Sequence, residues 1–133
     1  MSTCVFCEII AGRAPATIVR EWHSDIAIVP FNPVTNGHVI VIPRVHVPDA
    51  TTSANVSGQT MRQAARLARG MGPCDIITSV GAEATQTVLH LHVHVIPRQA
   101  GDGLSGGRSR PPVEDLAVAR GTVEAPTTTK DGS

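Results

Sequence analysis

Three histidines alternate with aliphatic residues in one short stretch of the chain, Leu89-His90-Leu91-His92-Val93-His94-Val95. Successive side chains of a β-strand point to opposite faces, so a strand here puts His90, His92 and His94 on one face and the aliphatic residues on the other. Imidazole titrates near neutral pH and can act as nucleophile, acid, base or metal ligand. The pattern therefore predicts a strand with one aliphatic face for a core and one face for chemistry.

Length and composition predict one globular domain of 133 residues, with 41% hydrophobic residues but only 2% aromatic ones. A core must therefore be built mainly from Val, Ile, Leu and Ala. The formal net charge of zero gives no electrostatic reason to expect nucleic acid or a membrane surface as partner. No apolar run approaches the roughly 20 residues that span a bilayer, and the N-terminus lacks the pattern of a secretion signal. Three cysteines, two of them in a Cys-x-x-Cys, favour a cytoplasmic protein with a metal or thiol role.

Hydrophobic periodicity and turn residues divide the chain into successive elements. The expected elements are a short helix at residues 4–11, strands at 17–20, 25–31 and 37–43, a long helix at about 55–71, and strands at 75–80 and 87–97. This order predicts an α+β fold, a single antiparallel sheet of about five strands with one long and one short helix. Residues 1–100 are expected to form the domain. Residues 101–133, rich in Gly, Pro, Ser and Thr, are expected to form a flexible tail, with a short helix at 113–120 as an alternative.

Apolar spacing also predicts which side chains face the core. In the strand at 37–43, Ile40 and Ile42 lie on the same face as His38, whereas Val39 and Val41 lie on the opposite face. The apolar stripe of the long helix is expected to consist of Met61, Ala64, Leu67, Ala68 and Met71, with Arg62, Arg66 and Arg69 toward the other side.

The Cys4-Val5-Phe6-Cys7 segment has the spacing of half a tetrahedral zinc site. His46 and one of the three alternating histidines are the candidates for the other half. A redox pair or two packed thiols without a ligand are the alternatives. Cys74 stands alone and is interpreted as a small apolar residue rather than a ligand.

The three alternating histidines are about 6.5–7 Å apart along a strand, which suits three separate tasks on one substrate. A nucleophilic imidazole needs one nitrogen for attack and the other held by an acceptor such as a backbone carbonyl. The alternatives are a three-histidine zinc site that activates water and a solvated strand face. His38 at the start of a strand can orient a neighbouring ring, and Gln86 and Thr87 can donate to phosphate oxygens, although ordinary loop polarity also accounts for the last two.

Taken together, these segments resemble the histidine triad (HIT) family, in its Hint-like branch with a Cys-x-x-Cys zinc site. The matching segments are Cys4-Val5-Phe6-Cys7-Glu8-Ile9-Ile10-Ala11-Gly12 with Pro15, Asn32 through His46, and Gln86-Thr87-Val88 before His90-Leu91-His92-Val93-His94-Val95-Ile96. The resemblance covers residues 4–98. It implies a nucleotide-binding hydrolase that cleaves at the α-phosphate of a nucleoside phosphoramidate or dinucleoside polyphosphate, through a nucleotidyl-histidine. A nucleotidyl transferase acting on a small metabolite and a nucleotide-binding module with little catalysis are the alternatives.

The resemblance also implies a role for individual residues. His92 would attack phosphorus, His94 would contact phosphate oxygens or assist the leaving group, and His38 would orient the imidazoles. Gln86 and Thr87 would contact phosphate. The residues that would line the base pocket are Val5, Phe6, Ile9, Ile28 and Phe31. The ligands of a structural zinc would be Cys4, Cys7, His46 and His90, which makes His90 a member of both the catalytic and the metal set.

Two positions depart from the family pattern. Pro30 stands where the family commonly has an aspartate that binds the ribose hydroxyls, and Ser79 stands where it often has a phosphate-facing asparagine. The expected ligand is a purine nucleotide or nucleotide conjugate, and the base and sugar are left open by these departures. A catalytic metal is not required by this layout. The resemblance further implies a homodimer. From the charge and the apolar runs discussed above, we expect no nucleic acid and no membrane as partner.

Overall fold

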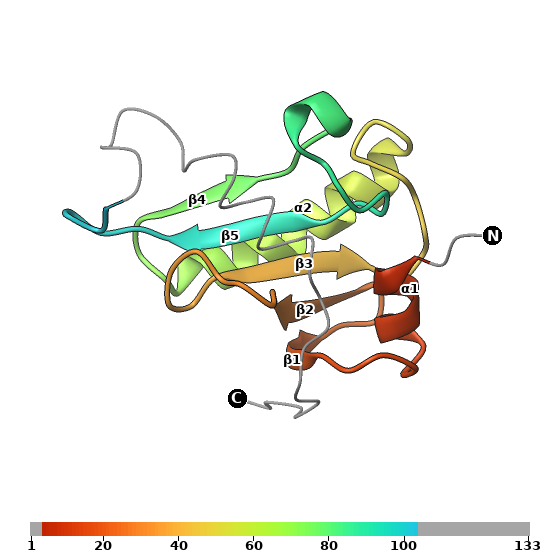
Figure 1. Ribbon diagram of the computed structural model, residues 1–133, viewed down its shortest axis with the longest axis horizontal. Coiled ribbons are helices and arrows are strands. Elements are labelled where there is room, and N and C mark those ends of the chain that lie inside the picture. Colours follow the sequence, from red (N-terminus) through yellow and green to blue (C-terminus); the bar gives the residue numbers. More distant parts are fainter. Residues whose placement is uncertain (1–3, 104–133) are drawn as a thin grey trace.

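The computed structural model describes residues 4–103, and its helices and strands occur in the predicted order. The elements are α1 (Val5–Ile10), β1 (Thr17–Glu21), β2 (Asp25–Val29), β3 (Val39–Pro43), α2 (Ala54–Arg69), β4 (Cys74–Ile77), the 3₁₀ helix η1 (Ala82–Ala84) and β5 (Val93–Pro97). The strands form one antiparallel sheet in the order β1-β2-β3-β5-β4 (Figure 1). This confirms the predicted fold class. Most of the predicted tail, with its alternative helix at 113–120, lies outside the described residues.

Local signals account for where the two helices begin. The Cys4 thiol caps α1 by accepting a hydrogen bond from the Cys7 N–H, at 3.3 Å. Ser53 caps α2 in the same way through the Val56 N–H, and α2 ends before Gly70. The first cysteine of the Cys-x-x-Cys is therefore also the residue that starts α1, which holds both thiols close together.

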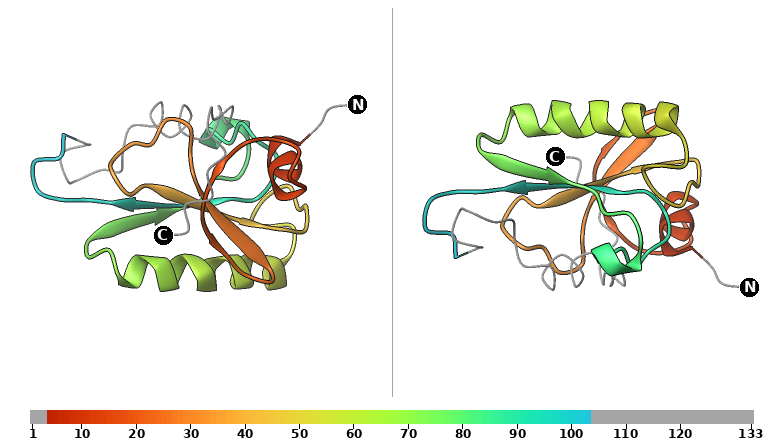
Figure 2. Two further views of the ribbon diagram at one scale, coloured as in Figure 1. Left: turned by 90° about the horizontal axis from the view of Figure 1, so that it is seen from below. Right: turned by 90° about the horizontal axis from the view of Figure 1, so that it is seen from above.

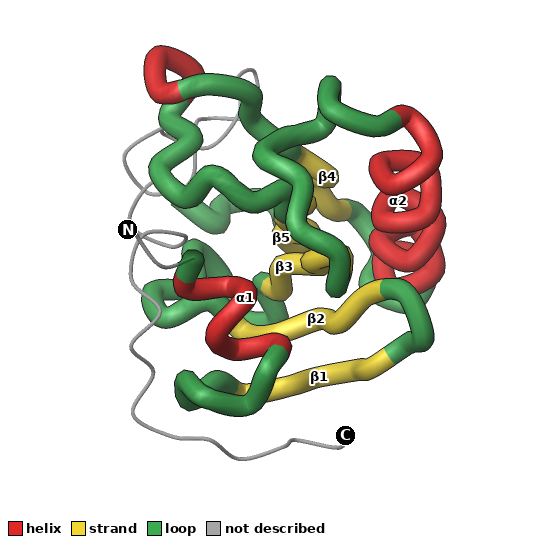
Figure 3. The backbone as a smooth tube through the Cα atoms, turned by 90° about the vertical axis from the view of Figure 1, so that its right-hand side faces the viewer, coloured by secondary structure: helices red, strands yellow, loops and turns green. Residues whose placement is uncertain are grey.

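The sheet separates two cores of different composition. Helix α2 covers one side of the sheet, whereas α1 and η1 lie on the other side (Figures 2 and 3). We call these sides the α2 face and the α1 face. The α2 face buries Ala27, Val39, Val41, Val47, Ala64, Leu91, Val93 and Val95. The α1 face buries Phe6, Ile9, Ala16, Ile26, Ile28, Ile40 and Ile42. The predicted division of the strand at 37–43 is confirmed.

The last two strands are shorter than predicted. The strand expected at 87–97 begins only at Val93, and the one expected at 75–80 ends at Ile77. Strand β3 pairs with β5 only from Val39 to Val41, so the residues before Val93 have no partner in that ladder. Residues 88–90 instead form a bend, in which the His90 N–H donates to the Val88 carbonyl. The Leu91 N–H that follows donates to the Val47 carbonyl of the segment after β3. His90 and His92 therefore precede the strand, but the alternation of faces continues through them.

The predicted stripe of α2 is wrong at one position. Met61 is 43% exposed, whereas its neighbour Thr60 is fully buried. The Thr60 hydroxyl donates to the buried Asp25 carboxylate at 2.7 Å, which satisfies both groups and turns Thr60 toward the sheet. One residue further along a helix the direction rotates by about 100°, and this carries Met61 outward. Counting only apolar residues missed this polar anchor.

The described part of the chain contains no helix of the length and apolarity needed to cross a membrane.

Candidate active site and metal site

Four potential metal ligands meet where α1, the segment after β3 and the segment before β5 come together. Their ligand atoms, from Cys4, Cys7, His46 and His90, all lie within 4.8 Å of one another. The Cys4 Sγ is 3.3 Å from the His90 Nδ1, and the Cys7 Sγ is 3.4 Å from the His46 Nδ1. The two Nδ1 atoms are 3.1 Å apart. The structure thus brings together the four residues predicted as zinc ligands.

These distances fit a tetrahedral ion with two sulfur and two nitrogen ligands. Zinc bond lengths put neighbouring ligand atoms of such a site roughly 3.3–3.8 Å apart. The ring of His90 is set for this role, because its Nε2–H donates to the Pro43 carbonyl at 2.9 Å and leaves a lone pair on Nδ1. Two thiols and two Nδ1 atoms converging in this way are the donor set that zinc prefers.

In the absence of a metal ion, burial shifts the pKa values of Cys7 and His90. Burial, followed by the hydrogen bond with Cys4, raises the pKa of the Cys7 thiol to about 11. Burial lowers the pKa of His90 to about 4, with a smaller contribution from His46, while the bond to Pro43 opposes that decrease. His90 is therefore a neutral ligand at pH 7, and the thiols are the groups that would release protons to a cation.

His92 is buried on the α1 face, and its ring is oriented by the main chain. Its Nδ1–H donates to the carbonyl of His90 at 2.7 Å, so in the neutral ring Nε2 carries the lone pair. The fully buried Phe6 ring packs edge-on against His92, with centroids 5.0 Å apart. A carbonyl acceptor on Nδ1 is the arrangement that the sequence analysis required of a nucleophilic imidazole.

A chain of hydrogen bonds determines the tautomers of the other two buried rings. The Val34 N–H donates to Nδ1 of His38 at 2.9 Å, and an amide can only donate here. His38 therefore carries its proton on Nε2 and donates it to Nδ1 of His94 at 3.0 Å. This leaves the His94 proton on its buried Nε2. Burial lowers the pKa of His38 to about 4, so the chain starts from a neutral ring at pH 7.

The polar residues predicted to contact phosphate lie in different surroundings. Gln86 is buried, and its amide is bonded to main-chain groups, so a phosphate contact would require those bonds to open. Thr87 is exposed, and Ser79 is half-buried just beyond β4. Sequence reasoning missed Thr78, whose hydroxyl donates to the His92 carbonyl at 2.8 Å. Nothing in a lone threonine at the end of a strand signals this contact.

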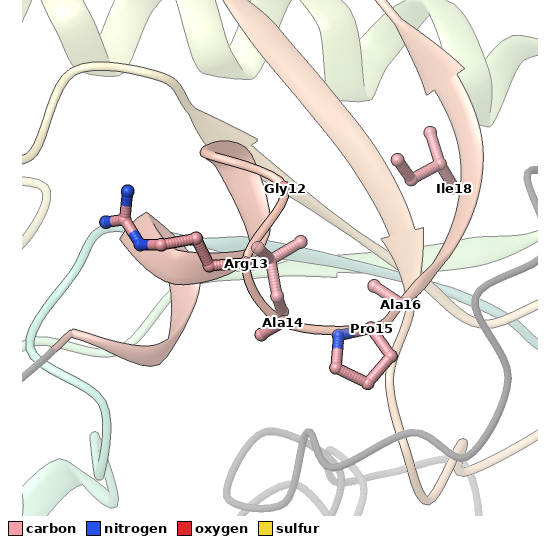
Figure 4. Close-up of a pocket in the computed structure, with 7 residues that line it drawn as sticks. Gly12, Arg13, Ala14, Pro15, Ala16 and Ile18 are labelled. Carbon is pink, nitrogen blue, oxygen red and sulfur yellow. The ribbon is translucent and has the colours of Figure 1, made fainter.

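The residues predicted to line a base pocket are only partly brought together. Phe6 and Ile28 are fully buried, and Val5 and Phe31 are half-buried. Ile9 lines a cavity of about 440 Å³ on the α1 face, between α1 and β1 (Figure 4). The other residues that line this cavity are Gly12, Arg13, Ala14, Pro15, Ala16 and Ile18. The Arg13 side chain extends away from Ile18 and pairs with Glu8, which leaves a mostly apolar wall.

The structure places a group of buried imidazoles beside a Cys₂His₂ cluster, and comparison with known proteins gives the family. The model of the HIT domain matches residues 11–101, so the chain belongs to the HIT family. An uncharacterized HIT-like protein of Mycobacterium tuberculosis is 39% identical over 109 residues, which cover 77% of this chain and 76% of the relative. The adenylylsulfatase HINT3 of Arabidopsis thaliana is 32% identical over 113 residues, covering 80% of this chain and 57% of that protein.

Solved structures support the same assignment. A zinc-bound histidine triad family protein from Mycobacterium smegmatis superposes with a TM-score of 0.67 at 32% identity, over 90% of this chain and 91% of that one. A HIT family hydrolase from Clostridium thermocellum superposes with a TM-score of 0.67 at 32% identity, over 76% and 95% of the two chains. A hydrolase and a zinc-bound protein are thus among the solved structures that this chain resembles.

Proposed function

We propose that this protein hydrolyses purine nucleotide conjugates at the α-phosphorus, with nucleoside 5′-phosphoramidates as the first substrates to test and dinucleoside polyphosphates as the second. The tautomers of the buried rings carry this proposal, because they set a lone pair on His92 Nε2 beside a proton on His94 Nε2. The first group can attack phosphorus, and the second can donate a hydrogen bond to a phosphoryl oxygen. The adenylylsulfatase relative supports the substrate class by its name.

The reaction proceeds in two displacements. In the first, His92 Nε2 forms a bond to phosphorus while the P–N bond of the N-protonated phosphoramidate breaks. The bonding electron pair leaves on that nitrogen, which departs as the neutral amine because it already carries the extra proton. In the second, the oxygen of a water molecule attacks phosphorus and the bond to the ring breaks, which returns the electron pair to Nε2 of His92. The water gives up one proton to solvent, and the nucleoside monophosphate is released. A neutral imidazole suits the first step, since it is not repelled by an anionic phosphate.

We assign zinc a structural role at the site formed by Cys4, Cys7, His46 and His90. A bound ion would link α1 to the segment before β5 and would hold His90, whose carbonyl orients His92. Each chemical step described above uses only imidazole groups of this chain.

The apolar cavity beside α1 is the proposed position of the nucleobase. It lies on the same face of the sheet as His92, and its lining near Ile9, Ala16 and Ile18 suits a flat apolar ring. Ala14→Trp should fill the cavity and raise KM several-fold with little change in kcat. Ala11→Trp, at an exposed position outside the lining, is the matched control and should leave both constants unchanged.

The test of the activity is release of AMP from adenosine 5′-phosphoramidate, with diadenosine polyphosphates and adenylyl sulfate in parallel. Protein denatured at alkaline pH, where the P–N bond of a nucleotidyl-histidine persists, should contain a nucleotidyl group that is absent from His92→Ala. An added alcohol or sugar phosphate that discharges this group faster than water would instead indicate a transferase. Nucleotide binding without turnover of any conjugate would reject the hydrolase and leave a binding module.

The homodimer implied by the family resemblance and the cytoplasmic location favoured by the cysteine content also remain proposals. Ile76, 37% exposed on β4 at one edge of the sheet, is a candidate contact for a second copy. Light scattering with Ile76→Lys tests the dimer, and cell fractionation tests the location.

A further inference from the structure

Gln86 is one of two buried glutamines among the described residues, and its side chain forms three hydrogen bonds with main-chain groups. Its Oε1 accepts from the Gly81 N–H at 2.8 Å. Its Nε2 donates to the Pro48 carbonyl at 2.7 Å and to the Val88 carbonyl at 3.0 Å. One amide thus links the segment after β3, at Pro48, to two points of the loop before β5, at Gly81 and Val88.

Two of these segments carry the histidines of the metal site. Pro48 lies two residues after His46, and Val88 lies two residues before His90. Directly beside this amide, the Leu91 N–H donates to the Val47 carbonyl at 2.8 Å. The segment at 46–48 and the segment at 88–91 are therefore held together at two adjacent points, one of which is the Gln86 side chain.

The same contacts extend to the nucleophile. The Val88 carbonyl accepts from both Gln86 and the His90 N–H, and the His90 carbonyl accepts from Nδ1–H of His92. A shift of the Val88 carbonyl would move the His90 backbone and with it the acceptor that sets the His92 tautomer. The ladder between β3 and β5 does not hold this part of the backbone, because residues 88–91 lie before the first paired residue of β5, Val93.

We propose that Gln86 is a positioning residue that sets the separation of His46 and His90 for metal binding and fixes the tautomer of His92, rather than a ligand of the substrate phosphate. Its consequence for catalysis rests on the proposed function, whereas its consequences for metal affinity and for the His92 tautomer do not.

The backbone next to Gln86 supports this role. Thr85 adopts a left-handed conformation with φ +75°, which is costly for a β-branched residue. Gly81, whose N–H bonds Gln86, has φ +92° and ψ 155°, a region open essentially to glycine alone. A loop strained at this point persists only where neighbouring contacts hold it, and the Gln86 amide supplies such contacts.

The decisive variant is Gln86→Glu, which keeps the shape but places a carboxylate oxygen against the Pro48 and Val88 carbonyls. Zn²⁺ affinity is measured by competition with a chromophoric chelator, and the His92 tautomer is read from ¹⁵N spectra of the histidine rings. We expect Zn²⁺ affinity to fall at least tenfold and His92 to lose its single Nδ1–H tautomer. With a phosphoramidate substrate, kcat should fall while KM stays nearly constant.

Gln63→Glu is the matched control, since Gln63 is the other buried glutamine but lies on α2. It should leave Zn²⁺ affinity and the His92 spectrum unchanged. If Gln86→Glu does not fold, Gln86→Met keeps the packing volume without charge and is measured in the same way, with the same expectation.

Unchanged Zn²⁺ affinity and an unchanged His92 tautomer in the Gln86 variant would overturn the proposal. So would a rise in KM alone, which would identify Gln86 as a substrate contact. If the wild type hydrolyses no conjugate, the proposed function fails, but the chelator and ¹⁵N measurements still decide the role of Gln86. If the wild type binds no Zn²⁺, the ¹⁵N spectra of His92 decide it.

Discussion

The two faces of the sheet use neighbouring residues of the same segment for opposite purposes. Leu91, Val93 and Val95 join the aliphatic core under α2, whereas His90, His92 and His94 are buried against the α1 face. The α2 face is built mainly from aliphatic groups, with the bonded Asp25–Thr60 pair at its margin. The α1 face contains buried imidazoles, and each of them needs a partner at a fixed position.

Those partners come largely from the main chain. The Pro43 carbonyl, the His90 carbonyl and the Val34 N–H each hold one ring nitrogen. Apolar packing depends on volume and tolerates small shifts, but a hydrogen bond weakens steeply when its geometry changes. We therefore expect changes on the α2 face to lower stability, and changes on the α1 face to alter chemistry and metal binding.

The largest contrast is expected between His92→Ala and Val93→Ala. Removing the proposed nucleophile should lower kcat/KM by about 10³-fold or more, roughly 4 kcal/mol of transition-state stabilisation. Val93→Ala should lower the free energy of unfolding by about 2 kcal/mol, with kcat/KM nearly unchanged. Steady-state kinetics and denaturant unfolding of both variants measure this. Comparable kinetic losses in the two variants would remove the distinction between the faces.

The next contrast concerns the cysteines. Cys4→Ser should abolish binding of about one zinc per chain and lower the free energy of unfolding by several kcal/mol, because binding of a structural metal contributes to folding. Cys74→Ser, partly buried on the α2 side, should lower it by about 1 kcal/mol with the metal retained. Elemental analysis and thermal unfolding with and without chelator measure both. Equal stability of the metal-free and metal-treated wild type would argue against the structural site.

A pH effect should separate His38 from an exposed histidine. The folded-state pKa of His38 is about 4 against an ordinary value of 6.5, so between these values the unfolded chain binds more protons than the folded one. The free energy of unfolding should therefore decrease as pH falls through this window, by about 2 kcal/mol from pH 7 to pH 5 for His38 alone. Denaturant unfolding should show a smaller decrease in His38→Asn. The exposed His23→Asn should keep the wild-type dependence, and identical slopes in all three proteins would contradict the assignment.

The smallest effect concerns the strained loop on the α1 face. Thr85→Gly should raise the free energy of unfolding by about 0.5–1 kcal/mol, because glycine adopts φ +75° without steric cost. The exposed Thr87→Gly, at a position without positive φ, should lower it slightly. Chemical denaturation of both measures the difference, and a decrease in Thr85→Gly would show that the threonine side chain contributes more than its conformation costs.

Much of the architecture could be predicted from alternating side chains and turn residues. The order of elements and the two faces of β3 followed from periodicity in a chain rich in Val and Ile. The first residue of β5 could not be predicted in this way, because it is set by the length over which β3 pairs with β5. Met61 was misplaced since the hydrogen bond between Thr60 and Asp25 joins groups 35 residues apart.

The candidate site divides in the same way. Cys-x-x-Cys spacing indicated half of a metal site, and the family resemblance supplied the full set that the structure brings together at His46 and His90. The main-chain contacts of Gln86 and the Thr78 bond to His92 could not be predicted, because carbonyl and amide positions leave no mark in side-chain patterns.

The hydrogen-bonded chain from the Val34 N–H through His38 to His94 has a consequence for the substrates of the proposed reaction. A peptide N–H does not release its proton at neutral pH, so the Val34 amide cannot supply a proton to His38 or, through it, to His94. In their neutral forms these rings can polarise a departing group without protonating it. The leaving nitrogen of a phosphoramidate must then be protonated before the bond breaks. The proposed reaction therefore favours conjugates with a basic leaving atom or with a leaving group that is stable as an anion. Simple alkyl esters have neither and should react poorly.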